Sequence, residues 1–138
     1  MLKRRALVHL AFSGWVTSLT AGLVLFSNAA YALTIKPFTD ADFAAAQATG
    51  TPVAIHFTAT WCPTCKAQDK SLAALAADPE LKAVTILKSD YDLSKALQKQ
   101  MKVTSQSTFV VFKGKAEVAR NSGATDALEI KTLLIKSL

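Results

Sequence analysis

Short apolar runs alternate with helical segments along residues 33–138, and this alternation restricts the fold more than any other feature of the chain. Three runs of strand length are each followed by a helical stretch, and a hairpin and a last helix close the chain. Strands that alternate with helices form a parallel sheet covered on both faces, and a terminal hairpin adds antiparallel strands to it. The sequence therefore predicts an α/β domain with a mixed sheet and the element order β-α-β-α-β-α-β-β-α.

Caps, breakers and apolar spacing set the expected boundaries of these elements. The segment 39–42 resembles a capping box, and Gly50 ends the helix that it begins. The expected strands are 33–38, 53–57, 84–87, 108–112 and 116–120, and the expected helices are 40–49, 61–75, 93–101 and 125–138. We expect apolar faces built from Leu93, Leu97 and Met101 in the third helix and from Leu128, Leu133 and Leu134 in the last.

Composition and charge exclude several classes of protein. Two cysteines in 138 residues are too few for a disulfide-stapled miniprotein or a four-cysteine zinc site. The sequence contains neither a Gly-rich phosphate loop nor an HExxH motif. The formal net charge is +6, but beyond the N-terminus the lysines are scattered without basic runs or interleaved aromatic residues. We therefore expect no nucleic-acid partner.

Residues 1–32 carry the features of a secretory signal peptide. Lys3, Arg4 and Arg5 precede an apolar stretch over 6–26, and Ala30-Tyr31-Ala32 is a small-x-small cleavage site. The sequence thus predicts a signal peptide over 1–32 and an exported domain over 33–138. The alternative is an uncleaved anchor, because the apolar stretch is long enough to span a bilayer. Only in that case do we expect contact with a membrane.

The pair Cys62 and Cys65, separated by Pro63 and Thr64, lies where a buried strand passes into a helix. Unpaired N–H groups and partial positive charge at a helix N-terminus stabilise a thiolate at the first cysteine. Pro63 suits the first helical turn, where its missing N–H costs nothing. We expect Trp61 to shield one side of the pair while Cys62 stays exposed. Cys62 is then the nucleophile that attacks a substrate disulfide, and Cys65 resolves the mixed disulfide.

Two other interpretations of the cysteine pair compete with this one. A plain structural disulfide is a poor staple here, because so short a loop restrains little chain entropy. The pair could also form half of a metal site. The Trp before the motif and the strand-to-helix setting favour redox chemistry over both.

The segment 53–66, the hairpin turn over 112–115 and the closing Gly123-Ala124 resemble those of the thioredoxin family. The resemblance spans nearly the whole domain and implies a thioredoxin-like three-layer α/β/α sandwich. The segment 77–81 and the signal peptide resemble exported bacterial relatives, such as the C-terminal domain of the electron-carrying interchange protein DsbD. The resemblance therefore implies a periplasmic thiol–disulfide oxidoreductase.

Two family positions on the strand side of the motif carry candidate proton-transfer groups. The family usually has a buried Asp six residues before the first cysteine, where this chain has His56. An imidazole could relay a proton at the second cysteine, as the family implies for the carboxylate. Its place in an apolar run also suits a neutral core histidine. The family has a Lys near this acid, and Lys88 matches that position, although a solvated lysine is the competing interpretation.

Ser107 stands where the family places a cis-proline beside the cysteines, and Thr108 follows it as in the family. A cis bond before a residue other than proline costs about 3 kcal/mol, so we expect a trans bond at Ser107. In the family this loop presents its backbone to the bound substrate strand. The proline is also thought to keep metal ions off the cysteine pair, so its replacement bears on both substrate choice and metal binding.

The first functional hypothesis is a periplasmic thiol–disulfide oxidoreductase, with reduction of protein disulfides favoured over oxidation. It needs protein thiol or disulfide substrates and an upstream redox partner, and we expect a monomer. Its redox-active group is the Cys62–Cys65 disulfide, with no metal or organic cofactor. The second hypothesis is a copper or zinc delivery module using Cys62, Cys65 and His56. The third is a non-catalytic binding domain that keeps a vestigial motif.

Overall fold

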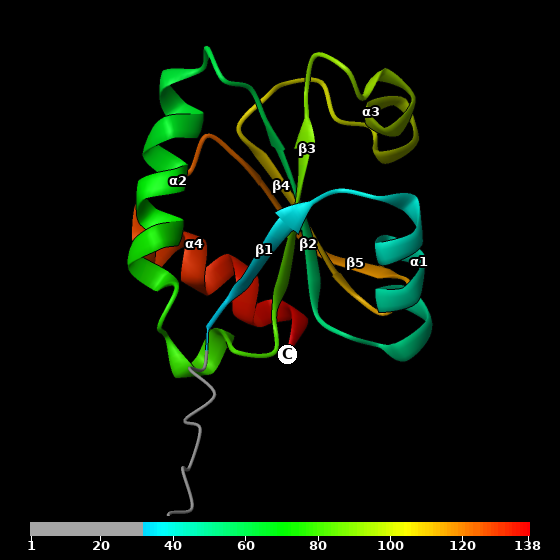
Figure 1. Cartoon of the computed structure of the whole chain (residues 1–138), viewed down its shortest axis with the longest axis vertical. Helices are drawn as coiled ribbons and strands as arrows, with labels where there is room; N and C mark the ends of the chain where they lie inside the picture. Colours follow the sequence, from blue (N-terminus) through cyan, green and yellow to red (C-terminus); the bar gives the residue numbers. More distant parts are fainter. Residues whose placement is uncertain (1–31) are drawn as a thin grey trace, which may run out of the picture.

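A mixed five-stranded sheet forms the centre of the molecule in the computed structural model, which describes residues 32–138 (Figure 1). The strand order is β1-β3-β2-β4-β5, in which β2 pairs with β3 in parallel and with β4 antiparallel. The strands are β1 (Thr34–Pro37), β2 (Val53–Thr58), β3 (Thr85–Asp90), β4 (Thr108–Lys113) and β5 (Ala116–Ser122). The predicted fold class, element order and mixed sheet are confirmed.

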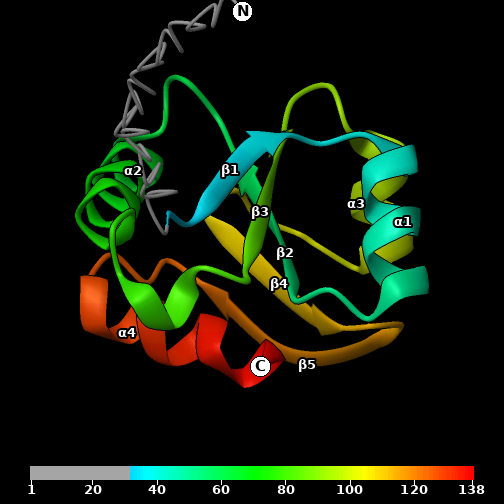
Figure 2. The ribbon, with the colours of Figure 1, turned by 60° about the horizontal axis from the view of Figure 1, so that its bottom comes forward.

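Helices cover both faces of the sheet, as the alternating sequence predicts (Figures 1 and 2). Helices α1 and α3 lie on one face, and α2 and α4 lie on the other. Their bounds are α1 (Asp40–Thr49), α2 (Pro63–Leu75), α3 (Lys95–Met101) and α4 (Ala127–Leu134). Short 3-10 turns span Pro79–Leu81 and Ile135–Ser137.

Side chains of β2 alternate between two apolar cores, because successive residues of a strand point to opposite faces. Val53, Ile55 and Phe57 pack in the core beneath α1 and α3. Ala54 packs in the core beneath α2 and α4. His56 has the same parity as Ala54, so the strand directs its imidazole towards α2.

The caps of α1 follow the sequence prediction. Thr39 is the N-cap, and its hydroxyl accepts from the backbone N–H of Asp42. Gly50 ends the helix with a φ of 71°, in the left-handed region that glycine enters without steric cost.

Two of the expected apolar faces are wrong at one leucine each. Helix α3 begins at Lys95 rather than at 93, and Leu93 is 83% exposed in the turn before it. Helix α4 begins at Ala127, and Leu128 is 70% exposed near its start. The buried stripe of the last helical segment instead begins at Ile130 and continues through Leu133 and Leu134.

The predicted signal peptide lies outside the described residues, except for Ala32 at its end. Within the described part of the chain, no helix has the length and apolar character needed to cross a membrane.

Candidate active site

The two cysteines lie at the N-terminus of α2, where the strand-to-helix motif predicts them. Cys62 is the N-cap residue, and its Sγ accepts from the backbone N–H of Cys65 at 3.1 Å. Pro63 occupies the first turn of the helix, as expected. Both cysteines are free thiols and both are buried. The arrangement aims the open end of the helix at the Cys62 sulfur.

Hydrogen bonds lower the pKa of the Cys62 thiol below its ordinary value. Burial raises this pKa, but donors around the sulfur outweigh it. Those donors are the Cys65 thiol, the Ser107 hydroxyl and the backbone N–H groups of Cys65 and Thr64. A thiolate, and not a thiol, is the nucleophile in disulfide exchange, so these donors prepare Cys62 for attack.

The expectation that Cys62 is exposed is wrong, because the residue is only 2% exposed. The neighbouring Trp61 is 56% exposed, and its indole N–H donates to the Asp92 carboxylate at 2.7 Å. The indole is thus fixed at the surface while the sulfur beside it is covered.

Ser107 lies against both sulfurs. Its Oγ is 3.1 Å from the Cys62 Sγ and 3.2 Å from the Cys65 Sγ. No cis peptide bond occurs among residues 32–138, which confirms the predicted trans bond at this serine. Its φ is 59°, in the left-handed region that residues other than glycine rarely enter. The loop thus brings a hydroxyl to the position that the family gives to a proline ring.

Gln68, which the sequence analysis missed, holds this loop in place. Its side chain is fully buried, and its amide nitrogen donates to the Ser107 carbonyl at 2.9 Å and to the Ala124 carbonyl at 2.8 Å. The signal was a polar residue within the buried stripe of α2, between Cys65 and Leu72. A polar side chain in such a stripe must find hydrogen-bond partners in the interior.

His56 binds the remaining atom of the Gln68 amide. The His56 Nε2 lies 2.8 Å from the Gln68 Oε1, which can only accept, so Nε2 carries the proton and donates. Nδ1 is buried and has no hydrogen-bond partner among residues 32–138, and the ring stacks on Phe109 with centroids 4.2 Å apart. Burial lowers the pKa of His56 to about 4, so the imidazole is neutral at neutral pH. The proton-relay role of His56 stays a prediction, and its contact in the structure is with Gln68.

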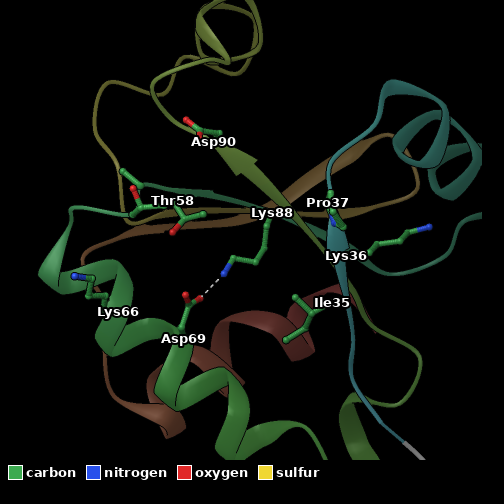
Figure 3. Close-up of a pocket in the computed structure, with 10 residues that line it drawn as sticks. Ile35, Lys36, Pro37, Thr58, Lys66, Asp69, Lys88 and Asp90 are labelled. Carbon is green, nitrogen blue, oxygen red and sulfur yellow. Dashed lines mark hydrogen bonds and ion pairs between the residues drawn. The ribbon is translucent and has the colours of Figure 1, made fainter.

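Lys88 lies beside His56 in the sheet, but its ammonium points away to Asp69 of α2. The two residues pair in the β2–β3 register, and Lys88 Nζ lies 2.8 Å from Asp69 Oδ1. Both groups line a pocket of about 560 Å³ where the parallel strands end, together with Thr58, Lys66 and Asp90 (Figure 3). This ion pair is half-exposed, and the structure places Lys88 in the pocket wall. Its relay role also stays a prediction.

Thr108 begins β4 directly after Ser107 and is buried. Its hydroxyl donates to the Ser105 carbonyl at 2.8 Å and lies 2.7 Å from the Ser122 hydroxyl of β5. The residue thus anchors the end of the loop that carries Ser107 to the sheet.

The metal-delivery alternative gains no support from the described residues. In the range 32–138, no group of three or more His, Cys, Asp and Glu side chains is arranged to hold a metal ion. The Nε2 of His56 is already engaged by Gln68, so it does not complete a ligand set with the cysteines.

Comparisons with known proteins agree with this geometry. The thioredoxin family model matches residues 34–136. This chain belongs to the thioredoxin family. A thioredoxin of Chlamydia trachomatis is 43% identical over 84 residues, which cover 61% of this chain and 80% of the relative. Thioredoxin-1 of Drosophila melanogaster is 35% identical over 74 residues, which cover 54% of this chain and 68% of the relative.

Solved structures show the same relationship. The crystal structure of Trxlp from Edwardsiella tarda superposes with a TM-score of 0.70 at 36% identity and covers 73% of this chain and 98% of its own. A thioredoxin of Malassezia sympodialis has the same fold, with a TM-score of 0.64 at 21% identity over 78% of this chain and 95% of its own. Family membership and the Cys62/Cys65 pair identify this protein as a thiol–disulfide oxidoreductase that acts on protein thiols and disulfides.

Proposed function

We propose that this thioredoxin-family protein is an exported, periplasmic reductase of protein disulfides. The observation that carries the proposal is the Cys62 sulfur at the start of α2, where backbone N–H groups and a hydroxyl donate to it and lower its pKa. Such an environment favours a nucleophilic thiolate over a structural thiol. The cysteine pair is the whole redox centre in this proposal.

Reduction proceeds by two exchange steps. The Cys62 thiolate attacks one sulfur of the substrate disulfide and forms a mixed disulfide, while the second substrate sulfur leaves as a thiolate and takes up a proton. Cys65 then loses its proton and attacks the Cys62 sulfur. The Cys62–Cys65 disulfide forms, and the first substrate sulfur leaves and is protonated. The substrate gains two electrons and two protons, and an upstream dithiol donor must return them to the protein.

Exchange with a model substrate tests the assignment of the two cysteines. The reduced protein is mixed with insulin, and the formation of insulin thiols is followed over time. Cys62→Ser should abolish the exchange, because the remaining Cys65 has no partner sulfur with which to resolve a mixed disulfide and release the reduced substrate. Cys65→Ser should accumulate a mixed disulfide that mass spectrometry detects. Retained exchange in the Cys62→Ser variant would remove the proposal.

Equilibration with glutathione tests the direction. The proportion of protein with a Cys62–Cys65 disulfide is measured by mass after alkylation at a series of glutathione ratios. A reductase should form its disulfide even when reduced glutathione is in large excess. A pair that stays reduced in an oxidising mixture would instead indicate an oxidase.

Export rests on the sequence features of residues 1–32. A fusion of this segment to a reporter enzyme that needs disulfides for activity should be active outside the cytoplasm of a bacterial host. A fusion with Lys3, Arg4 and Arg5 replaced by Glu is the matched control and should be exported less well. Activity that is equally low with both segments would contradict the proposed location.

A further inference from the structure

We propose that the Ser107 hydroxyl is a catalytic group of the exchange reaction, which donates a hydrogen bond to whichever cysteine sulfur carries the negative charge. The inference deepens the proposed function and rests on it for the identity of the reaction. Ser107 stands where the family has a proline, and a proline at this position has no hydroxyl and no N–H to donate. The chain therefore brings to the sulfurs a chemical group that a proline there would lack.

The Ser107 hydroxyl lies between the two sulfurs. Ser107 Oγ is 3.1 Å from the Cys62 Sγ and 3.2 Å from the Cys65 Sγ, so neither contact is favoured by distance. A hydroxyl has one proton and rotates about its C–O bond to suit its partner. It can donate to one sulfur at a time and can change partners without any movement of its oxygen.

The backbone around the Ser107 hydroxyl is held from two sides. The Ser107 carbonyl accepts from the Gln68 amide at 2.9 Å and from the backbone N–H of Gly123 at 2.9 Å. Gln68 is itself held by the Ala124 carbonyl and by His56. Because Gln68, His56 and Ala124 are buried, the serine keeps its left-handed conformation and its hydroxyl stays at the sulfurs.

During the reaction the negative charge appears first on the Cys62 sulfur and then on the Cys65 sulfur. In the reduced protein the negative charge lies on Cys62, and the Ser107 O–H donates to that sulfur. After Cys62 enters the mixed disulfide, its sulfur is neutral, and the next charge to form is on Cys65. The same O–H then turns to Cys65 and stabilises the thiolate that attacks. The hydroxyl transfers no proton, and it interacts more strongly with either thiolate than with the neutral disulfide that ends the cycle.

Two consequences separate this role from a merely structural one. Loss of the hydroxyl should raise the pH at which Cys62 ionises, because one donor to the thiolate is gone. It should also shift the glutathione equilibrium towards the disulfide, because the hydroxyl binds the thiolate of the reduced form more strongly than the neutral disulfide. A residue that only fills space in the loop would change neither quantity.

The experiment is a titration of the Cys62 thiolate in the wild type and in Ser107→Ala. The ultraviolet absorbance of the thiolate and the rate of alkylation by iodoacetamide are both recorded against pH. We expect the alkylation rate at neutral pH to fall by roughly tenfold in Ser107→Ala, since a hydrogen bond to a charged group is lost. At high pH, where Cys62 is fully ionised in both proteins, the rates should converge.

Two further variants keep the test decisive. Ser107→Gly also removes the hydroxyl and suits the left-handed backbone, so it serves if the alanine variant folds poorly. Ser105→Ala removes a nearby hydroxyl of the same loop, whose contact is with Thr108 and not with a sulfur, and should behave as the wild type. Wild-type ionisation of Cys62 in the folded alanine or glycine variant would overturn the inference. None of these measurements uses a protein substrate, so the failure of the wild type to reduce insulin is distinguishable from a Ser107 hydroxyl that has no effect on Cys62.

Discussion

The buried His56 side chain contacts one hydrogen-bond partner and one aromatic ring. The Nε2–H donates to Gln68, the ring stacks on Phe109, and no group in the described part of the chain is hydrogen-bonded to Nδ1. A protonated imidazole would place an unpaired N–H and a positive charge in this interior, which explains why burial lowers its pKa to about 4. The side chain thus serves as a neutral donor that fixes the orientation of the Gln68 amide.

The pKa of His56 makes the stability of the fold depend on pH. Below its ordinary pKa of 6.5 the unfolded chain binds a proton at this residue, whereas the folded protein does not until about pH 4. The free energy of unfolding should therefore fall as the pH falls through this window, by about 3 kcal/mol in all. Urea unfolding at several pH values measures this loss.

His56→Gln is the control for that prediction, because glutamine can still donate to Gln68 but does not titrate. The variant should lose the part of the pH dependence that lies between pH 6.5 and about 4, while the dependence due to carboxyl groups remains. An identical pH profile in the wild type and in the variant would mean that the pKa of His56 in the folded protein is not lowered from its value in the unfolded chain.

Gln68 acts at the scale of elements, because its side chain joins four separate segments of the chain. From α2 it binds β2 through His56, the loop before β4 through Ser107, and the segment between β5 and α4 through Ala124. These segments are distant in the sequence, and the amide brings them together at the cysteine pair. The geometry of the site therefore depends on one polar side chain within the α2 stripe.

Gln68→Leu should both destabilise the fold and change the chemistry of the site. The substitution leaves the His56 N–H and the Ala124 carbonyl unpaired, so the free energy of unfolding should fall by about 2–4 kcal/mol. Ser107 loses one of the two donors to its carbonyl, so the pH at which Cys62 ionises should rise. Urea unfolding and the thiolate titration measure the two effects.

Gln100→Leu is the matched control, since Gln100 is exposed on α3. It should change the free energy of unfolding by less than about 0.5 kcal/mol and leave the ionisation of Cys62 unaltered. A Gln68→Leu protein that is less stable but titrates as the wild type would show that Gln68 supports the fold without positioning Ser107.

The elements themselves were more predictable than the residues that line the site. Alternating apolar runs and caps predict the order of strands and helices along the chain, because these signals are local. Leu93 was misplaced because the Asp90 carboxylate accepts from the N–H groups of Asp92 and Leu93, which forms a turn before α3 can begin. Such competition between a side chain and the helix is visible only when the backbone path is known.

Leu128 was misplaced for a related reason. Asp126 caps α4 through the N–H groups of Leu128 and Glu129, and this cap sets the rotation of the helix. The face that reaches the core is then Ile130, Leu133 and Leu134, which follows the i, i+3, i+4 pattern of a buried stripe. The family resemblance places Ser107 beside the cysteines, but the contacts of its hydroxyl with both sulfurs depend on the folded loop, which brings together residues 45 and 42 positions apart.

At the scale of the whole molecule, two apolar cores flank the sheet, and the polar chain from His56 to Ser107 lies on the α2 side. The cysteine pair is thus coupled to the interior as well as to the surface. Because the fold donates hydrogen bonds to a thiolate, the redox state of the pair and the stability of the fold are thermodynamically linked.

Unfolding of the reduced and oxidised forms tests this link. At neutral pH, Ser107→Ala should lower the free energy of unfolding of the reduced protein by about 1 kcal/mol or more, because only that form contains a thiolate to lose its donor. The oxidised protein should change less. Urea unfolding of both redox forms measures the difference, and equal losses in the two forms would argue against a thiolate-specific contact.

The left-handed backbone at Ser107 has a consequence for how this protein could be redesigned. A residue with a Cβ pays roughly 1 kcal/mol for a φ of 59°, and glycine would avoid that penalty. Stability and reactivity therefore oppose each other at Ser107. Ser107→Gly has the less strained backbone, but it lacks the hydroxyl that donates to the Cys62 sulfur. A glycine substitution made in this loop to raise thermal stability would therefore lower the rate of disulfide exchange.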